Sequence, residues 1–170
     1  MEIFKEQLIR KNPDSQDQIK KVLIIIAAVI LAVLLFWFSW GSPFAIIGIV
    51  LAGLVLYGAY FLLTNLMVEY EYILTNGELD VDKIMGQRTR KRLATLNIAK
   101  ATEFGEAGDN LSVRENETFI KADANNPQVK NYYIRVNHKT LGDTVLLFTP
   151  SEEMLEEVKK ALPRTLQYRF

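Results

Sequence analysis

Two long apolar runs dominate the first half of the chain. Residues 22–68 contain no Asp, Glu, Lys, Arg or His, and only Gly41-Ser42-Pro43 interrupts the block. The first run, Val22–Trp40, has 19 residues and would span about 28 Å as a helix. The second, Phe44–Met67, has 24 residues and would reach about 36 Å. Both suit a bilayer core of about 30 Å, so the pattern predicts a transmembrane helical hairpin over residues 22–67.

A cleaved signal peptide is the competing interpretation of the first run. It is disfavoured because 21 residues precede the run and a second span follows at once. The hairpin divides the chain into an N-terminal segment, 1–21, the membrane hairpin, 22–67, and a domain, 68–170.

After residue 68 the apolar positions alternate with polar ones, as in β-strands. Turn residues separate the predicted strands, and Asn76-Gly77 is a strong hairpin signal. The strands are expected at 68–74, 78–82, 88–96, 98–104, 111–114, 118–122, 131–137 and 144–149. Ser151 is predicted to cap a final amphipathic helix, which ends at Pro163. The fold class is therefore an α+β membrane protein, in which a two-helix transmembrane hairpin precedes a small antiparallel β-barrel or sandwich of about seven strands, capped by a C-terminal helix.

The segment before the first apolar run has two interpretations. Residues 2–11 could form a short helix, with Phe4 and Leu8 one turn apart, that lies on the inner leaflet, and Asn12-Pro13 would end it. The alternative is a solvated tail.

The placement of basic residues predicts the orientation of the hairpin. Lys20 and Lys21 stand at the start of the first span, whereas the connecting turn carries no charge. Further Lys and Arg residues follow the second span, from Lys83 onward. By the positive-inside rule, both termini are expected in the cytoplasm of a two-span protein of the cell membrane.

Small residues line one face of each predicted span. They are Ala28 and Ala32 on the first, and Ala45, Gly48, Ala52 and Ala59 on the second. Such faces let helix backbones approach closely. Packing within the hairpin is favoured, and the alternative is a homo-oligomer through the face of the second span. The spans hold no ionisable residue, so transport by this chain alone is disfavoured.

The stretch from Tyr72 to Val81 reads Tyr-Ile-Leu-Thr-Asn-Gly-Glu-Leu-Asp-Val, and Gly86 and the basic run Arg88–Arg92 follow it. This order resembles the opening hairpins of bacterial pleckstrin-homology-like (PH-like) domains. Phe148-Thr149-Pro150-Ser151-Glu152-Glu153, leading into a helix, is similar to the closing element of that family. Leu96-Asn97-Ile98 departs from the family pattern because it lacks a proline. The resemblance implies a PH-like fold over residues 68–162 and brings no catalytic residues with it.

The basic third strand of the domain is the candidate site for an acidic lipid or a partner. Its residues are Arg88, Arg90, Lys91 and Arg92. The preceding strand carries Glu78, Asp80 and Asp82, and a short turn at Gly86 would set Asp82 opposite Arg90 and Asp80 opposite Arg92. Opposite charges across antiparallel strands stabilise by about 0.2–1 kcal/mol per pair. We favour this neutralised arrangement over a free patch for anionic headgroups.

Composition narrows the chemistry. The chain has no cysteine, which excludes disulfides, thiolate metal sites and cysteine nucleophiles. Residues 69–170 hold 15 basic and 16 acidic residues, so the domain is not expected to bind nucleic acid. His138 is the only histidine and is expected at the surface, while Asp109, Glu115 and Glu117 lack the spacing of a metal loop. No catalytic, cofactor or metal site is predicted.

These features favour a non-enzymatic binding or scaffold protein, anchored in the membrane, whose PH-like domain meets protein partners at the inner leaflet. One alternative is an anionic-lipid-sensing module that uses the basic third strand. Another is an accessory subunit of a membrane enzyme or transporter. The identity of any partner, beyond the bilayer itself, does not follow from the sequence.

Overall fold

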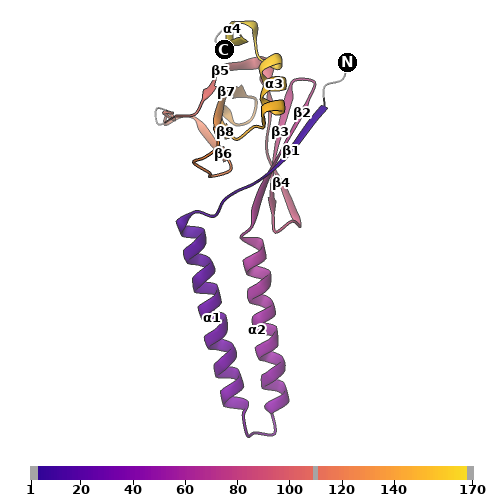
Figure 1. The fold of residues 1–170 in the computed structure, drawn as a ribbon, viewed down its shortest axis with the longest axis vertical. Helices are drawn as coiled ribbons and strands as arrows, with labels where there is room; N and C mark the ends of the chain where they lie inside the picture. Colours follow the sequence, from indigo (N-terminus) through magenta and orange to yellow (C-terminus); the bar gives the residue numbers. More distant parts are fainter. Residues whose placement is uncertain (1–3, 109–110, 168–170) are drawn as a thin grey trace. The chain divides into compact units, whose positions relative to one another are not determined.

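The computed structural model describes residues 4–108 and 111–167, and the chain forms two compact units. One unit holds two long helices, α1 (Ser15–Ser39) and α2 (Ala45–Asn65), and the other holds the strands and short helices (Figure 1). The strands are β1 (Phe4–Arg10), β2 (Val68–Thr75), β3 (Glu78–Met85), β4 (Thr89–Asn97), β5 (Ala101–Glu106), β6 (Thr118–Ala122), β7 (Tyr132–His138) and β8 (Gly142–Phe148). The short helices are η1 (Ile98–Lys100), α3 (Glu152–Ala161) and α4 (Arg164–Gln167).

α1 and α2 form the predicted helical hairpin and run side by side (Figure 1). Ala28 and Ala32 are buried on α1, and Gly48 is buried on α2. A Cβ placed on Gly48 would lie 1.8 Å from the Oγ atom of Ser39, so only glycine allows this approach. The predicted packing of small residues within the hairpin is therefore confirmed at Gly48, and a contact between copies through the same face stays a prediction. Both helices are long and apolar enough to span a membrane.

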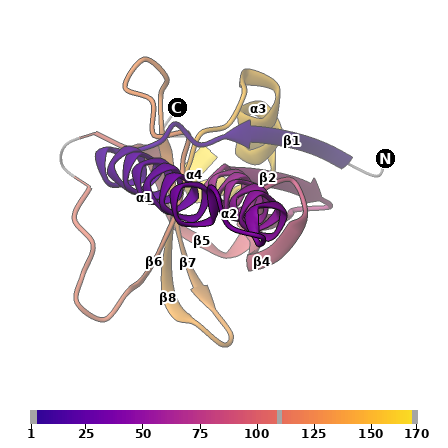
Figure 2. The same ribbon diagram turned by 90° about the horizontal axis from the view of Figure 1, so that it is seen from below.

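The N-terminal strand β1 is the main departure from the sequence-based expectation. Residues 4–10 form neither a helix nor a tail, so both interpretations of this segment are wrong. β1 pairs antiparallel with β2, from Phe4 opposite Thr75 to Arg10 opposite Glu69. It lies beside β2 (Figure 2) and becomes the edge strand of a sheet with the order β1-β2-β3-β4. The sandwich thus takes one strand from before the helical hairpin and the rest from after it.

The predicted turns between β2 and β3 and between β3 and β4 are confirmed. Asn76 and Gly77 have φ values of 48° and 85°, as a two-residue turn of type I′ requires. Gly86 and Gln87 also have positive φ values, of 58° and 56°. Since turns this short can join only antiparallel neighbours, β2, β3 and β4 form a meander.

The second sheet has the order β5-β7-β8-β6 and contains one parallel pair. β6 pairs parallel with β8, so the expectation of a purely antiparallel domain is wrong here. A long connection between β6 and β7 makes this pairing possible, because parallel neighbours need a crossover. Residues 111–114, predicted as a strand, have no regular structure, and the strand predicted from Ile98 starts at Ala101 because η1 occupies its first residues.

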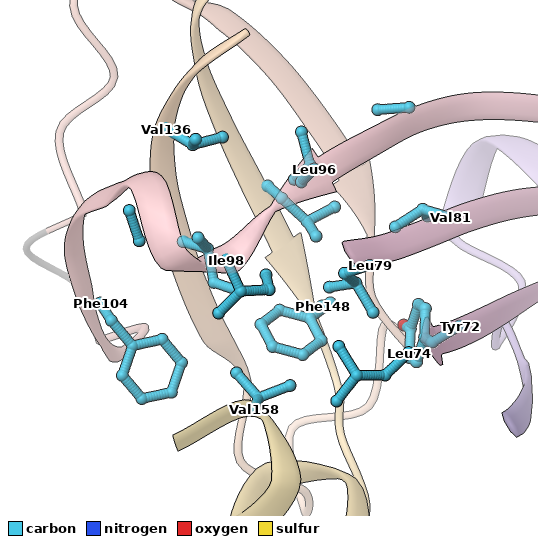
Figure 3. Close-up of a cluster of buried hydrophobic side chains, with 14 of the residues drawn as sticks. Tyr72, Leu74, Leu79, Val81, Leu96, Ile98, Phe104, Val136, Phe148 and Val158 are labelled. Carbon is cyan, nitrogen blue, oxygen red and sulfur yellow. The ribbon is translucent and has the colours of Figure 1, made fainter. Parts of the chain in front are cut away.

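The two sheets share one apolar core, which α3 and α4 complete (Figure 3). Its largest fully buried side chains include Tyr72, Leu79, Leu96 and Phe148, so both sheets contribute. The described residues form no closed barrel, and the predicted sandwich with a C-terminal helix is confirmed. The Tyr72 hydroxyl donates to the Ala122 carbonyl at the end of β6, which links the sheets through a buried polar contact.

Replacing Gly48 by alanine is expected to loosen the helical hairpin. The new Cβ would lie 1.8 Å from Oγ and 2.3 Å from Cβ of Ser39, so rotating the serine cannot relieve the clash. Overpacking of this kind costs about 1–3 kcal/mol. Gly53→Ala in the same helix is the matched control, because a Cβ there meets no atom within 4 Å.

The measurement is thermal unfolding of the full chain in detergent, followed by the fluorescence of Trp37 and Trp40. These are the two tryptophans of the chain, and both lie close to Ser39 in the sequence. Gly48→Ala should unfold at a lower temperature than the wild type, and Gly53→Ala should not. Equal midpoints for the two variants would contradict the proposed packing, whereas recovery of stability in Ser39→Gly/Gly48→Ala would support it.

Candidate functional site

Two basic side chains of β4, Arg90 and Arg92, are paired with acidic side chains of β2 and β3. Arg92 contacts Asp80 at 2.8 Å and also forms a short ion pair with Asp82. Arg90 lies 3.9 Å from Asp82 and 2.7 Å from Glu71. The two predicted pairs, Asp82 with Arg90 and Asp80 with Arg92, are therefore present, and the structure adds Glu71 as a third acid.

Two of these acids are buried, which explains why the arginines are held in place. Glu71 is 4% exposed and Asp82 is 2% exposed. A buried carboxylate without a cation costs several kcal/mol, so each requires a basic neighbour. The hydrogen bond from Arg92 to Asp82 raises the pKa of the guanidinium. Burial raises the pKa of the Glu71 carboxyl, and the nearby Arg90 opposes this rise.

The alternation of inward and outward side chains along β4 is interrupted, and as a result Thr95 lies on the same face as Arg92. Thr95 donates to Asp80 at 2.6 Å, and Arg92 donates to Thr95 at 3.2 Å. Residues 92 and 95 are an odd number of positions apart, so a regular strand would place them on opposite faces. The irregularity between them lets Ala94 and Leu96 enter the core while the polar side chains remain together.

The remaining predicted site residues do not join this network. Lys91 is exposed and forms no ion pair among the described residues. Arg88 lies in the turn before β4, where it is exposed and makes a contact of its own. Glu78 is exposed at the start of β3. The candidate site is thus split: Arg90 and Arg92 are neutralised, whereas Lys91 is a cation without an ion pair in the part of the chain that the structure describes.

Sequence reasoning missed Glu71, although the strand pattern contained a signal for it. Glu71 falls between Tyr70 and Tyr72, both of which face the core, so it must face the other side of β2. The predicted pairs involve only acids of β3, the strand directly beside β4. Arg90 reaches past β3 to β2, and a long guanidinium side chain permits this span.

A second charged cluster stabilises the connection between β5 and β6. Arg135 of β7, which is almost fully buried, contacts Glu117 at 2.8 Å, pairs with Glu103 and donates to the Ser112 carbonyl at 2.9 Å. Arg114 lies 3.5 Å from Glu103. These contacts hold residues 111–117, where the structure has no strand, against β5 and β7. Asp109 lies outside the described residues.

His138, the last residue of β7, supports a turn. Its Nδ1 atom accepts hydrogen bonds from the backbone N–H groups of Thr140 and Leu141, each at 3.2 Å. These bonds close the connection between β7 and β8. The geometry gives this histidine a local structural role.

A groove of about 720 Å³ lies beside β1 and was not anticipated. Gln7 and Ile9 of β1 form one wall, Val129 lies in the connection between β6 and β7, and Tyr132 and Leu155 contribute apolar surface from β7 and α3. The groove is formed entirely within the unit that contains the strands. It could not be predicted, because one wall is a strand whose position depends on pairing with β2.

Comparison with known proteins identifies one family. A family model described as "Bacterial PH-like domain (DUF6106)" matches residues 1–168. The match includes β1 and the helical hairpin as well as the rest of the sandwich. Comparisons with curated proteins and with solved structures gave no match.

The pairing of Arg92 with Asp80 and Asp82 is expected to be important for stability. Arg92→Gln would leave the buried Asp82 with one distant cation, and we expect a loss of about 1–3 kcal/mol. Lys91→Gln is the matched control on the neighbouring residue, with a change within about 0.5 kcal/mol. Amide hydrogen exchange of β3 and β4 in the full chain measures both effects. Similar exchange rates for the two variants would show that the observed ion pairs contribute little.

Proposed function

The chain belongs to the bacterial PH-like domain family, and on this premise we propose that it is a non-enzymatic, membrane-anchored binding protein. Its PH-like domain would meet protein partners at the inner leaflet. The hairpin of α1 and α2 supplies the proposed anchor, since both helices have the length and composition of membrane spans. The charge-free turn and the basic residues flanking the hairpin support cytoplasmic termini.

The neutralisation of β4 is the observation that favours protein over anionic lipid. An electrostatic lipid site needs clustered cations that are free to meet phosphate groups. Arg90 and Arg92 already contact Glu71, Asp80 and Asp82, so binding a headgroup would require exposing buried carboxylates. Protein recognition does not carry this cost, because apolar side chains and backbone groups can supply the contacts.

The orientation of the anchor can be tested by labelling introduced cysteines, because the wild-type chain has no cysteine that would react. Ser42→Cys in the connecting turn is expected to react with a membrane-impermeant maleimide in intact cells. Asn116→Cys in the domain is expected to react only after the membrane is permeabilised. The reverse pattern would exclude cytoplasmic termini, and labelling of both positions in intact cells would exclude the two-span arrangement. The wild-type chain is the control for non-specific labelling.

Whether the domain binds anionic lipid through β4, as opposed to a protein partner, can be tested on the full chain in vesicles. An environment-sensitive dye on Lys91→Cys should give the same spectrum in neutral vesicles and in vesicles containing phosphatidylglycerol, because the adjacent arginines are already paired. The same dye in Asp80→Asn/Lys91→Cys, which frees part of Arg92, should respond to the anionic lipid. A salt-sensitive response of Lys91→Cys alone would favour the lipid-sensing alternative and contradict our proposal.

A further inference from the structure

β1 is an edge strand, and the outward backbone groups of Glu6 and Leu8 have no partner among the described residues. Lys11 donates to the Val68 carbonyl at 3.0 Å, and the ladder between β1 and β2 continues from this pair at every second residue. The odd-numbered residues of β1 therefore bond to β2, while Glu6 and Leu8 direct their N–H and C=O groups away from it. No other described residue bonds to these groups of Glu6 and Leu8. Such an edge can accept another strand.

The groove beside β1 lies where the side chains of an added strand would project. Side chains alternate between the two faces of a strand, so every second side chain of an incoming segment would enter on the side of Gln7 and Ile9. Those residues form one wall of the groove, and Val129 and Leu155 provide apolar surface across it. An unused backbone edge and an apolar groove thus serve the same added strand.

The remaining side chains of an added strand would project on the exposed face of β1, and the residues on that face indicate which side chains would complement them. Phe4 and Leu8 are 62% and 57% exposed, and Glu6 lies between them. Glu6 forms no ion pair among the described residues, and its side chain shares a hydrogen bond with the buried Glu71. A segment with a basic side chain opposite Glu6, flanked by apolar side chains, would complement all three positions.

We propose that β1 binds an extended segment of a partner protein, in which apolar residues alternate around a central lysine or arginine. The segment adds as a fifth strand to the sheet of β1–β4, and its inward side chains fill the groove beside Gln7 and Ile9. This inference rests on the proposed function, and it names the surface and the class of partner.

Two registers in which a second copy of this chain could pair with the edge have a specific fault. Antiparallel pairing centred on Leu8 would set Phe4 opposite Asn12, whose outward N–H already donates to the Ala124 carbonyl at 2.8 Å. Pairing centred on Glu6 would set two carboxylates against each other. Each of these registers has a fault that a separate segment avoids.

The inward side chains of β1 are also engaged within their own chain. Lys5 contacts Glu153 at 2.6 Å, and Gln7 donates to the Thr149 carbonyl at 3.1 Å while accepting from the backbone N–H of Ser151 at 2.8 Å. A second β1 could not place these side chains in the groove without breaking its own contacts.

The test is a selection of random linear peptides, displayed on phage, on the full chain in lipid nanodiscs. Leu8→Pro removes an outward N–H and no bond to β2, because proline is compatible with the open side of an edge strand. Leu8→Thr is the matched control, since it keeps that N–H. Val129→Lys, a change in the groove wall at an exposed position, provides a second variant that leaves β1 untouched.

Selected peptides should alternate apolar residues around a lysine or arginine. They should bind Leu8→Pro and Val129→Lys at least about tenfold more weakly than the wild type, with a smaller loss for Leu8→Thr. Glu6→Lys should shift the preference toward an acidic centre by about two- to fivefold.

Three outcomes would overturn the inference. One is the absence of any selected binder, and another is equal binding to the wild type and to both Leu8→Pro and Val129→Lys. The third is a dimer of the full chain that Leu8→Pro dissociates, because a second copy would then occupy the edge. If partner proteins cross-link in cells to surfaces remote from β1 and Leu8→Pro has no effect, the proposed function stands and this inference fails.

Discussion

The antiparallel pairing of β1 with β2 is the interaction on which the arrangement of the sandwich depends. It brings a strand from before the helical hairpin into the same sheet as the strands that follow it. Without this pairing β2 would be the sheet edge, and Gln7 could not bond to the residues that lead into α3. The family match from residue 1 agrees with a domain that includes β1. The sandwich is consequently discontinuous in sequence, with the hairpin inserted between two hydrogen-bonded strands.

Buried acids set the electrostatic character of the sheet that β1 completes. Glu71 and Asp82 are almost fully enclosed, and removing a cation from either would leave a carboxylate that water cannot reach. Arg90 and Arg92 are about half exposed, so their pairs add little through direct attraction, and their importance lies in preventing that penalty. Arg90 and Arg92 therefore stabilise the sheet, and they contribute little free positive charge to its surface.

Local patterns predicted the parts of the fold that depend on local chemistry. The apolar runs predicted α1 and α2, Asn76-Gly77 predicted a hairpin, and Ser151 predicted the start of α3, where its side chain accepts from the Met154 backbone at 3.2 Å. The parallel pairing of β6 with β8 could not be predicted, because it joins strands separated by a long connection and leaves no periodic signal.

β1 escaped prediction for a different reason. Its inward residues, Lys5 and Gln7, are polar and find partners near α3, so the alternation of apolar and polar positions that normally marks a strand is absent. The exposed positions carry Phe4 and Leu8 instead, whose spacing matches a helical turn. The candidate site was also only partly predictable. The short β3–β4 turn predicts which charges of these two strands face each other, whereas Glu71 lies on β2, one strand further away.

The exposure of apolar side chains on β1 is also relevant to function. In an ordinary half-buried strand the apolar side chains face the core, whereas β1 presents Phe4 and Leu8 to solvent and directs Lys5 and Gln7 toward α3, so that Ile9 alone of its apolar side chains packs against the core. Exposed apolar residues on an unpaired edge favour aggregation, and proteins usually protect such an edge with charges or a covering element. Here a single carboxylate, Glu6, separates Phe4 from Leu8, and no described element covers them. A surface with this composition is better explained by the proposed recognition of a partner than by stability, because backbone groups and apolar side chains at β1 remain available while Arg90 and Arg92 of β4 are already neutralised.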